Sequence, residues 1–163
     1  MNIYTTDKIR NVVLLGHGGS GKTSLAEAFG YLSGITSRMG KVDDGNTLSD
    51  YSKEEQKRHF SISTSVIPIE WEGYKINIID TPGYFDFVGE VEEAVSAAGA
   101  AIIVVNGKSG IEVGTQKAWE LCEKYKLPRF IYVSNMDVDN ASFRQVVDCL
   151  LYTSPSPRDI SGT

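Results

Sequence analysis

Short apolar runs recur along this chain, and most of them end in glycine, asparagine or aspartate before an amphipathic stretch begins. This rhythm is typical of strands that alternate with helices around a buried parallel sheet. We expect strands at residues 11–15, 61–71, 74–80, 100–105 and 130–133, and helices at residues 22–29, 90–98, 115–125 and 141–150. Glu72 and Gly73 separate two β-rich runs, which predicts an antiparallel hairpin. The expected class is α/β, with ligands bound at the carboxyl ends of the strands.

A glycine-rich loop follows the first predicted strand, where residues 16–23 read Gly-His-Gly-Gly-Ser-Gly-Lys-Thr and match G-x-x-x-x-G-K-[ST]. Its glycines let backbone N–H groups turn toward a phosphate, and the next helix points its positive end at the same place. Lys22 would contact the β- and γ-phosphates, and the Thr23 hydroxyl would bind Mg²⁺. The predicted nucleotide contacts are Gly16, His17, Gly18, Gly19, Ser20, Gly21, Lys22, Thr23 and Ser24. A simple glycine-rich turn with an exposed lysine is the alternative. The loop predicts a P-loop NTPase, a three-layer α/β sandwich with a mostly parallel sheet.

A second motif, Asp80-Thr81-Pro82-Gly83, ends another predicted strand. The aspartate can hold Mg²⁺ through water, and the Gly83 N–H can reach a γ-phosphate. Taken alone, the motif is also a plausible β-turn. Joined to the phosphate loop in one sheet, it predicts a segment that changes shape when the γ-phosphate leaves.

Composition limits the setting in which this chemistry takes place. The 163 residues fit one domain, and the net charge of −5 argues against direct DNA binding. The longest apolar run, residues 97–105, is too short to span a bilayer, and no signal pattern opens the chain. Cys122 and Cys149 lack metal-ligand spacing and fit a reducing compartment. We expect a cytoplasmic monomer without membrane contact.

Residues 16–23, 40–62, 80–90 and 128–137 together resemble the G domain of elongation factor G, and the resemblance runs from about Asn11 to Phe143. Residues 41–45 and 55–58 stand where that family has its first switch, and residues 85–90 continue the second switch. The resemblance implies a translational GTPase that binds GTP, GDP and Mg²⁺ and couples hydrolysis to ribosomal translocation. The alternative is a nucleotide-gated ribosome-binding or ribosome-protection paralogue with little intrinsic turnover. An ATP-dependent P-loop enzyme conflicts with Asp137, which follows a buried strand.

Two switch residues depart from the family pattern. Ser61 stands where the family has a metal-binding threonine, and it keeps the hydroxyl, although it could be an ordinary strand serine. Tyr84 replaces a histidine that positions the attacking water, and a tyrosine stays neutral at pH 7. We therefore expect weak intrinsic hydrolysis that depends on a partner such as the ribosome. Tyr84 could instead only pack beside Phe85 and Phe87. The predicted catalytic residues are Lys22, Gly83 and Tyr84, and the predicted metal ligands are Thr23, Ser61 and Asp80.

A third departure concerns base recognition, where Ser134, Asn135, Met136 and Asp137 replace the Asn-Lys-x-Asp of guanine-specific relatives. The Asp137 carboxylate can accept two hydrogen bonds from guanine and is repelled by adenine N1. Ser134 is expected to lose a bond to the base or to the phosphate loop, and Asn135 lacks the lysine stem that covers the ring. Guanine preference should persist with reduced affinity. The alternative for Asp137 is a helix cap.

The last part of the chain differs in composition from the rest. Residues 152–159 are rich in serine and proline, and they abandon the apolar period of the preceding helix. We expect residues 1–150 to form an incomplete G domain and residues 151–163 to be an adapter-derived extension, with the break between Val147 and Leu151. A domain truncated in this way would lack a later strand and a base-contacting loop, and it would bind nucleotide weakly or fold marginally.

Overall fold

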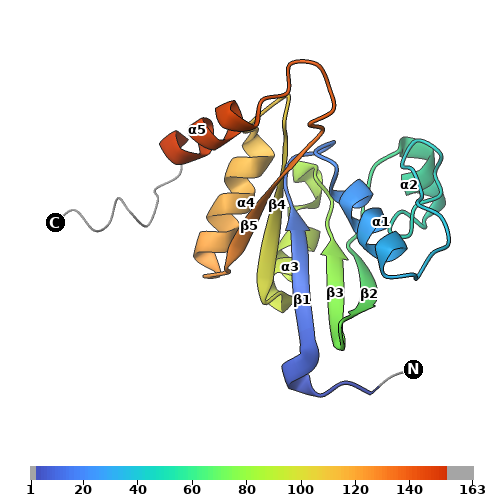
Figure 1. Cartoon of the computed structure of the whole chain (residues 1–163). Helices are drawn as coiled ribbons and strands as arrows, with labels where there is room; N and C mark the ends of the chain where they lie inside the picture. The colour runs from blue at the N-terminus through green and yellow to red at the C-terminus, as the bar shows by residue number, and fades with distance from the viewer. Residues whose placement is uncertain (1–2, 154–163) are drawn as a thin grey trace.

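The computed structural model describes residues 3–153 as a five-stranded sheet with the order β2-β3-β1-β4-β5 (Figure 1). Its strands are β1 Ile9–Leu15, β2 Ser65–Trp71, β3 Tyr74–Asp80, β4 Ala100–Asn106 and β5 Arg129–Ser134. The helices are η1 Thr6–Lys8, α1 Lys22–Leu32, α2 Lys53–Arg58, η2 Phe85–Phe87, α3 Val88–Ala97, α4 Val113–Lys124 and α5 Phe143–Thr153. Every strand pair is parallel except β2 with β3. The expected three-layer, mostly parallel α/β fold is confirmed.

The burial of each strand follows its residue pattern. The continuous apolar run of β4 lies inside the sheet, where Ile103, Val104 and Val105 are fully buried, as expected for a strand covered on both faces. In β2 the buried Ile67 and Ile69 alternate with exposed residues, because this strand lies at an edge of the sheet.

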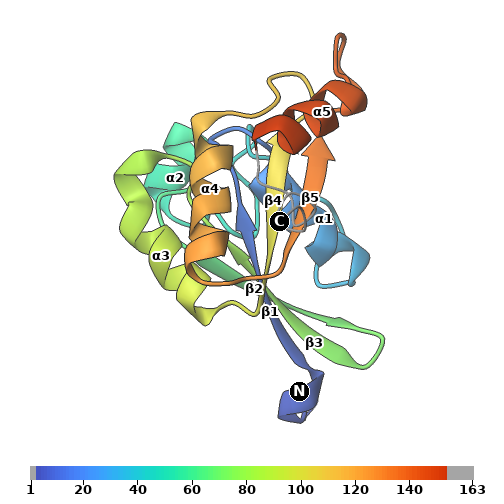
Figure 2. The ribbon, with the colours of Figure 1, turned by 90° about the vertical axis from the view of Figure 1, so that its left-hand side faces the viewer.

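Helices cover both faces of the sheet and form two cores. On one face, α3 and α4 pack against β1 and β4, with Val95 and Cys122 among the buried residues (Figure 2). On the other face, Ala26 and Phe29 of α1 pack against Ile67, in a smaller core with β2 and β3. The carboxyl ends of the parallel strands lie together at one end of the sheet, between these two helical layers.

Every predicted strand and helix is present, and most differences lie at the ends of the elements. The hairpin turns at Glu72 and Gly73 as expected, and Trp71 pairs with Tyr74. However, β2 begins at Ser65 rather than residue 61, because the amides of residues 62–64 bond to glutamate side chains instead of a strand. The helix α2 was not predicted, since its six polar residues show no apolar period.

The last helix is shifted relative to its predicted range of 141–150. Helix α5 begins at Phe143 and continues to Thr153. The proposed origin of residues 151–163 stays a prediction. The rest of the predicted extension, residues 154–163, lies outside the described residues. Within residues 3–153, no helix has the length and apolar character needed to cross a membrane.

Candidate nucleotide-binding site

The glycine-rich loop joins the carboxyl end of β1 to the start of α1. Gly16 has a φ of +142° and Gly21, which caps α1, has a φ of +92°; side chains are strained at both values. A Cβ on Gly16 would also collide with the carbonyl oxygen of Val104. The loop therefore needs glycine at these two positions to turn tightly beneath a bound group.

Lys22 is almost fully buried within the curve of this loop. Its Nζ donates to the carbonyl oxygens of His17 at 2.8 Å and Gly16 at 3.1 Å. Burial lowers the pKa of Lys22 to about 8, although the charge of Asp80 opposes that shift. A buried cation whose hydrogen bonds go to neutral carbonyl groups is suited to an anionic ligand.

A chain of buried oxygen atoms lies beside Lys22. Thr23 Oγ1 donates to Asp80 Oδ2 at 2.8 Å and lies 3.2 Å from Ser61 Oγ, and Ser61 Oγ donates to Asp50 Oδ1 at 2.7 Å. All four side chains are buried. The structure thus brings together the three predicted metal ligands, and it adds Asp50, for which the sequence gives no signal.

This group of oxygens fits a magnesium ion. Asp80 Oδ1 is buried and has no hydrogen-bond partner among residues 3–153. Burial raises the pKa of Asp80 to about 6, against the opposing effects of Thr23 and Lys22. Hydroxyl and carboxylate oxygens are the donors that Mg²⁺ prefers, and an unpaired buried carboxylate oxygen is a position where a cation would be stabilised.

The second switch lies against the phosphate loop. A Cβ on Gly83 would lie 2.5 Å from Lys22 Nζ and 2.7 Å from the backbone N of Gly18. A Cβ on Gly18 would in turn lie 3.1 Å from Tyr84 Cζ, so the tyrosine ring covers the loop. Gly83 and Tyr84, together with residues of the first switch, line a cavity of about 440 Å³ over Gly18, Lys22 and Thr23.

Tyr84 contacts an aromatic residue of the first switch. Its ring packs on Phe60, with ring centroids 4.8 Å apart. Phe60 precedes Ser61 in the first switch, so the contact is between the two switches. Sequence spacing could not reveal a contact between residues 24 positions apart.

The base-recognition motif lies at the carboxyl end of β5. Ser134 Oγ donates to the carbonyl oxygen of Ser20 at 2.7 Å, so this side chain does bond to the phosphate loop. Of the two losses expected for Ser134, the loss of a bond to the base stays a prediction. Asn135 has a φ of +51°, and Asn135 and Asp137 are exposed. Neither residue lines the cavity over Lys22.

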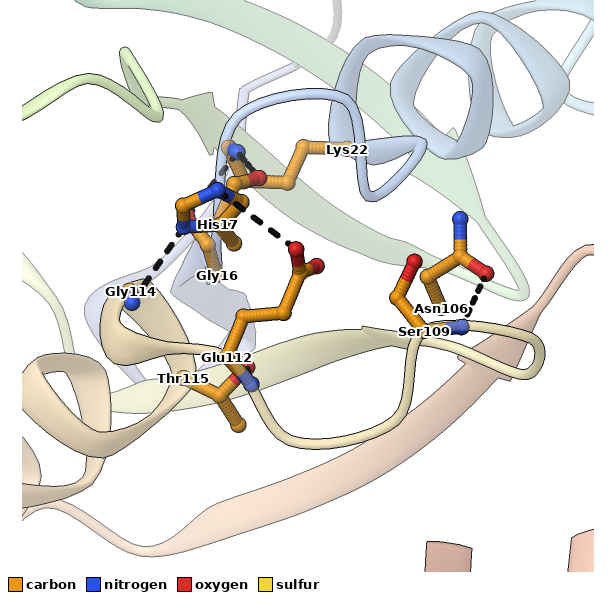
Figure 3. A network of polar contacts seen from close by, with 8 residues as sticks. All are labelled: Gly16, His17, Lys22, Asn106, Ser109, Glu112, Gly114 and Thr115. Carbon is orange, nitrogen blue, oxygen red and sulfur yellow. Dashed lines mark hydrogen bonds and ion pairs between the residues drawn. The ribbon is translucent and has the colours of Figure 1, made fainter.

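His17 ties the phosphate loop to helix α4 (Figure 3). Its Nδ1 accepts a hydrogen bond from the Gly114 N–H at 3.3 Å, and its Nε2 lies 3.6 Å from Glu112 Oε1. The side chain therefore points toward α4, while the His17 carbonyl accepts from Lys22. His17 was predicted as a nucleotide contact, and Glu112 was not predicted.

Two further buried carboxylates near the site were not predicted. Glu27 of α1 accepts hydrogen bonds from the backbone of the first switch, and Glu55 of α2 does the same. A signal existed for Glu55, because Ser52 and Glu55 have the Ser-x-x-Glu spacing of a capping box, which the structure contains. Nothing in the sequence distinguishes Glu27 from an exposed helical glutamate.

The fold and the loop define the class of this protein. A parallel sheet carries a glycine loop, a buried lysine and a helix start at its carboxyl edge, where doubly wound proteins bind ligands. The chain is a P-loop nucleotide-binding protein.

Comparison with known proteins identifies the family. The model of the family described as "Elongation factor Tu GTP binding domain" matches residues 7–154, and the chain belongs to this family. Elongation factor G 2 of Borreliella afzelii is 40% identical over 140 residues, which are 86% of this chain and 21% of that protein. Mitochondrial ribosome-releasing factor 2 of Rattus norvegicus is 37% identical over 143 residues, 88% of this chain and 18% of that protein. The chain spans about a fifth of the length of the curated relatives it matches.

Solved structures agree with this assignment. A crystal structure of a protein from Thermus thermophilus superposes with a TM-score of 0.86 at 39% identity, covering 90% of this chain and 22% of that one. Translation elongation factor SelB from Methanococcus maripaludis shares the fold, with a TM-score of 0.63 at 20% identity over 85% of this chain and 24% of that one. The chain is thus a G domain of the translational GTPase family.

Proposed function

We propose that this chain binds GTP and GDP with Mg²⁺ and acts as the G domain of an elongation factor G-like protein, in which GTP hydrolysis drives ribosomal translocation. The observation that carries the proposal is the buried set of Lys22, Thr23 and Asp80 at the carboxyl edge of the sheet, with Gly83 seated against the lysine. The names of its relatives, elongation factor G 2 and ribosome-releasing factor 2, support the link to translation.

Each residue has a distinct part in this proposal. Lys22 exchanges the carbonyl oxygens of Gly16 and His17 for phosphate oxygens, which its charge holds more strongly. Thr23, Ser61 and Asp80 hold the metal, and a bound Mg²⁺ would neutralise charge on the β- and γ-phosphates. The Gly83 N–H contacts the γ-phosphate.

Base selection is proposed for the end of β5. Asp137 accepts hydrogen bonds from guanine, while Ser134 steadies the loop through Ser20. The backbone groups of residues 16–24 complete the contacts to the nucleotide. Because Asn135 supplies no long apolar stem over the ring, we expect guanine affinity to be lower than in relatives that carry lysine there.

Intrinsic hydrolysis should be slow. The ring of Tyr84 is packed between Phe60 and Gly18, and a tyrosine offers no imidazole to orient a water molecule. Hydrolysis then depends on a partner, for which we propose the ribosome. A cytoplasmic location and a monomeric state belong to the same proposal.

The packing of Tyr84 also favours a second candidate, a nucleotide-gated ribosome-binding or ribosome-protection protein with little turnover. Phosphate release from GTP, measured with and without ribosomes, separates the two. The translocase proposal predicts a large stimulation by ribosomes in a protein that includes this G domain. Nucleotide-dependent ribosome binding with no stimulated release would instead support the second candidate.

A further inference from the structure

The first-switch segment, residues 40–63, closes one side of the nucleotide cavity. Its two ends line the cavity, with Lys41 and Val42 at the start and Phe60 and Ser61 near the end. Apart from the short helix α2, the segment contains no regular structure, so most of its backbone N–H groups have no helix or strand partner. Side-chain acceptors are therefore needed to bond these backbone N–H groups.

Glu27 holds the first half of the segment. It lies on α1, four residues after Thr23, and is 1% exposed. Its Oε2 accepts a hydrogen bond from the Gly40 N–H at 3.0 Å, and its Oε1 accepts one from the Leu48 N–H. The contact is close enough that a Cβ on Gly40 would lie 2.7 Å from Glu27 Oε2.

Glu55 holds the second half from inside the segment. Its Oε1 accepts hydrogen bonds from the N–H groups of Ile62 at 3.0 Å and Ser63 at 3.1 Å, and its Oε2 accepts one from Ser52 at 3.1 Å. Glu55 is also 1% exposed. The bond to Ile62 fixes the backbone directly after Ser61, the residue whose hydroxyl lies beside Thr23.

We propose that Glu27 and Glu55 are positioning residues that hold the first-switch segment over the nucleotide cavity, so that Ser61 stays beside the metal site. Five backbone N–H groups bond to these two carboxylates, and such charge-assisted bonds are stronger than neutral ones. The segment is then organised before nucleotide binds. This inference rests on the proposed function, because it assigns the held segment to a GTP site.

The substitutions Glu27→Gln and Glu55→Gln test the proposal in the full 163-residue chain. Each keeps the size of the side chain but replaces one accepting oxygen with an NH₂ group that faces an N–H donor. Glu54→Gln is the matched control, because Glu54 lies next to Glu55 on α2 but is exposed and pairs with Arg58. If Glu27→Gln does not fold, Gly40→Ala displaces residue 40 from Glu27 Oε2 and from the Asn46 carbonyl oxygen, which would lie 2.7 and 2.6 Å from the new Cβ, and it leaves the carboxylate in place.

Hydrogen exchange without nucleotide is the first measurement. Amides of residues 40–63 should exchange about tenfold faster in the two variants than in wild type or Glu54→Gln. Unchanged exchange in both variants would overturn the proposal. Hydrogen exchange is measured without nucleotide, so it tests whether Glu27 and Glu55 hold the segment even if the wild-type chain binds no nucleotide. Absence of nucleotide binding would contradict only the proposed function.

The second measurement compares the affinities for a non-hydrolysable GTP analogue and for GDP, both with Mg²⁺. A displaced Ser61 should weaken the GTP analogue about tenfold more than GDP, because the first switch faces the γ-phosphate side of the site. A purely structural role would weaken both nucleotides equally, and that result would contradict the positioning role.

Discussion

The rings of Phe60 and Tyr84 pack against each other with their centroids 4.8 Å apart and their planes inclined by 60°. Phe60 belongs to the first switch and Tyr84 to the second, so one aromatic pair joins the two segments. Tyr84 also covers Gly18 of the phosphate loop. A nucleotide that moves either switch must therefore move or break this contact.

Substituting Tyr84→His should raise the intrinsic rate of GTP hydrolysis. An imidazole at this position can orient a water molecule near neutral pH, and positioned acid–base groups contribute about a hundredfold or more in enzymes. We expect an increase of about tenfold, because Phe60 still restrains the ring. Single-turnover phosphate release measures it. Tyr84→Phe keeps the ring packing and should leave the slow rate unchanged; a wild-type rate equal to that of Tyr84→His would contradict the account.

Substituting Gly83→Ala should weaken nucleotide binding. The new Cβ would lie 2.5 Å from Lys22 Nζ and 2.7 Å from the backbone of Gly18, so the lysine and the loop must shift. We expect the dissociation constant for GDP to rise about tenfold or more, measured by fluorescence titration. Gly89→Ala is the control, because nothing lies within 4 Å of a Cβ at that position. Equal affinities in the two variants would show that the close approach of Gly83 has no role.

Substituting Asp137→Asn should shift base preference from guanine toward xanthine. The carboxylate accepts two hydrogen bonds from guanine, whereas an amide can donate to the xanthine carbonyl. GDP affinity should fall about a hundredfold and xanthosine diphosphate should become the better ligand. The neighbouring exposed residue provides the comparison, since Asp139→Asn should leave base preference as it is. If Asp137→Asn leaves the affinity for GDP unchanged, the guanine base does not bind at Asp137.

The thiol of Cys122 should make stability depend on alkaline pH. Burial raises its pKa from 9.0 to about 11, against a smaller opposing effect of Arg129. The unfolded thiol ionises first as the pH rises, so the stabilisation present below pH 9 is lost between about pH 9 and 11, by roughly 2 kcal/mol at pH 10.5. Urea unfolding of wild type and Cys122→Ala at pH 8 and 10.5 measures this difference. An equal loss in both proteins would show that Cys122 does not contribute.

The fold could be predicted from the sequence because its signals are local. The apolar run of β4, the Glu72-Gly73 turn and the loop of residues 16–23 each mark one element, and parallel strands then bring their carboxyl ends to one edge. Thr23 and Asp80 could be placed together on that basis, and they share a hydrogen bond of 2.8 Å.

The first switch could not be predicted in this way. Asp50 and Glu55 sit in polar stretches without period, whereas Glu27 lies on α1 among apolar residues. The partners of all three carboxylates lie in distant or irregular segments. The buried state of a carboxylate depends on backbone N–H groups that the sequence does not mark. Only the Ser52 and Glu55 spacing gave a usable signal, and it predicts a helix start rather than a link to Ile62.

Titration calorimetry with Mg²⁺ tests the central claim that the glycine loop and Lys22 bind a guanine nucleotide. The folded chain should release heat with GDP and with a GTP analogue, and no comparable heat with ADP. The variant Lys22→Ala, shown by circular dichroism to be folded, should lose the GDP signal. If the wild-type chain is folded and gives no heat with any guanine nucleotide, that result would contradict the account.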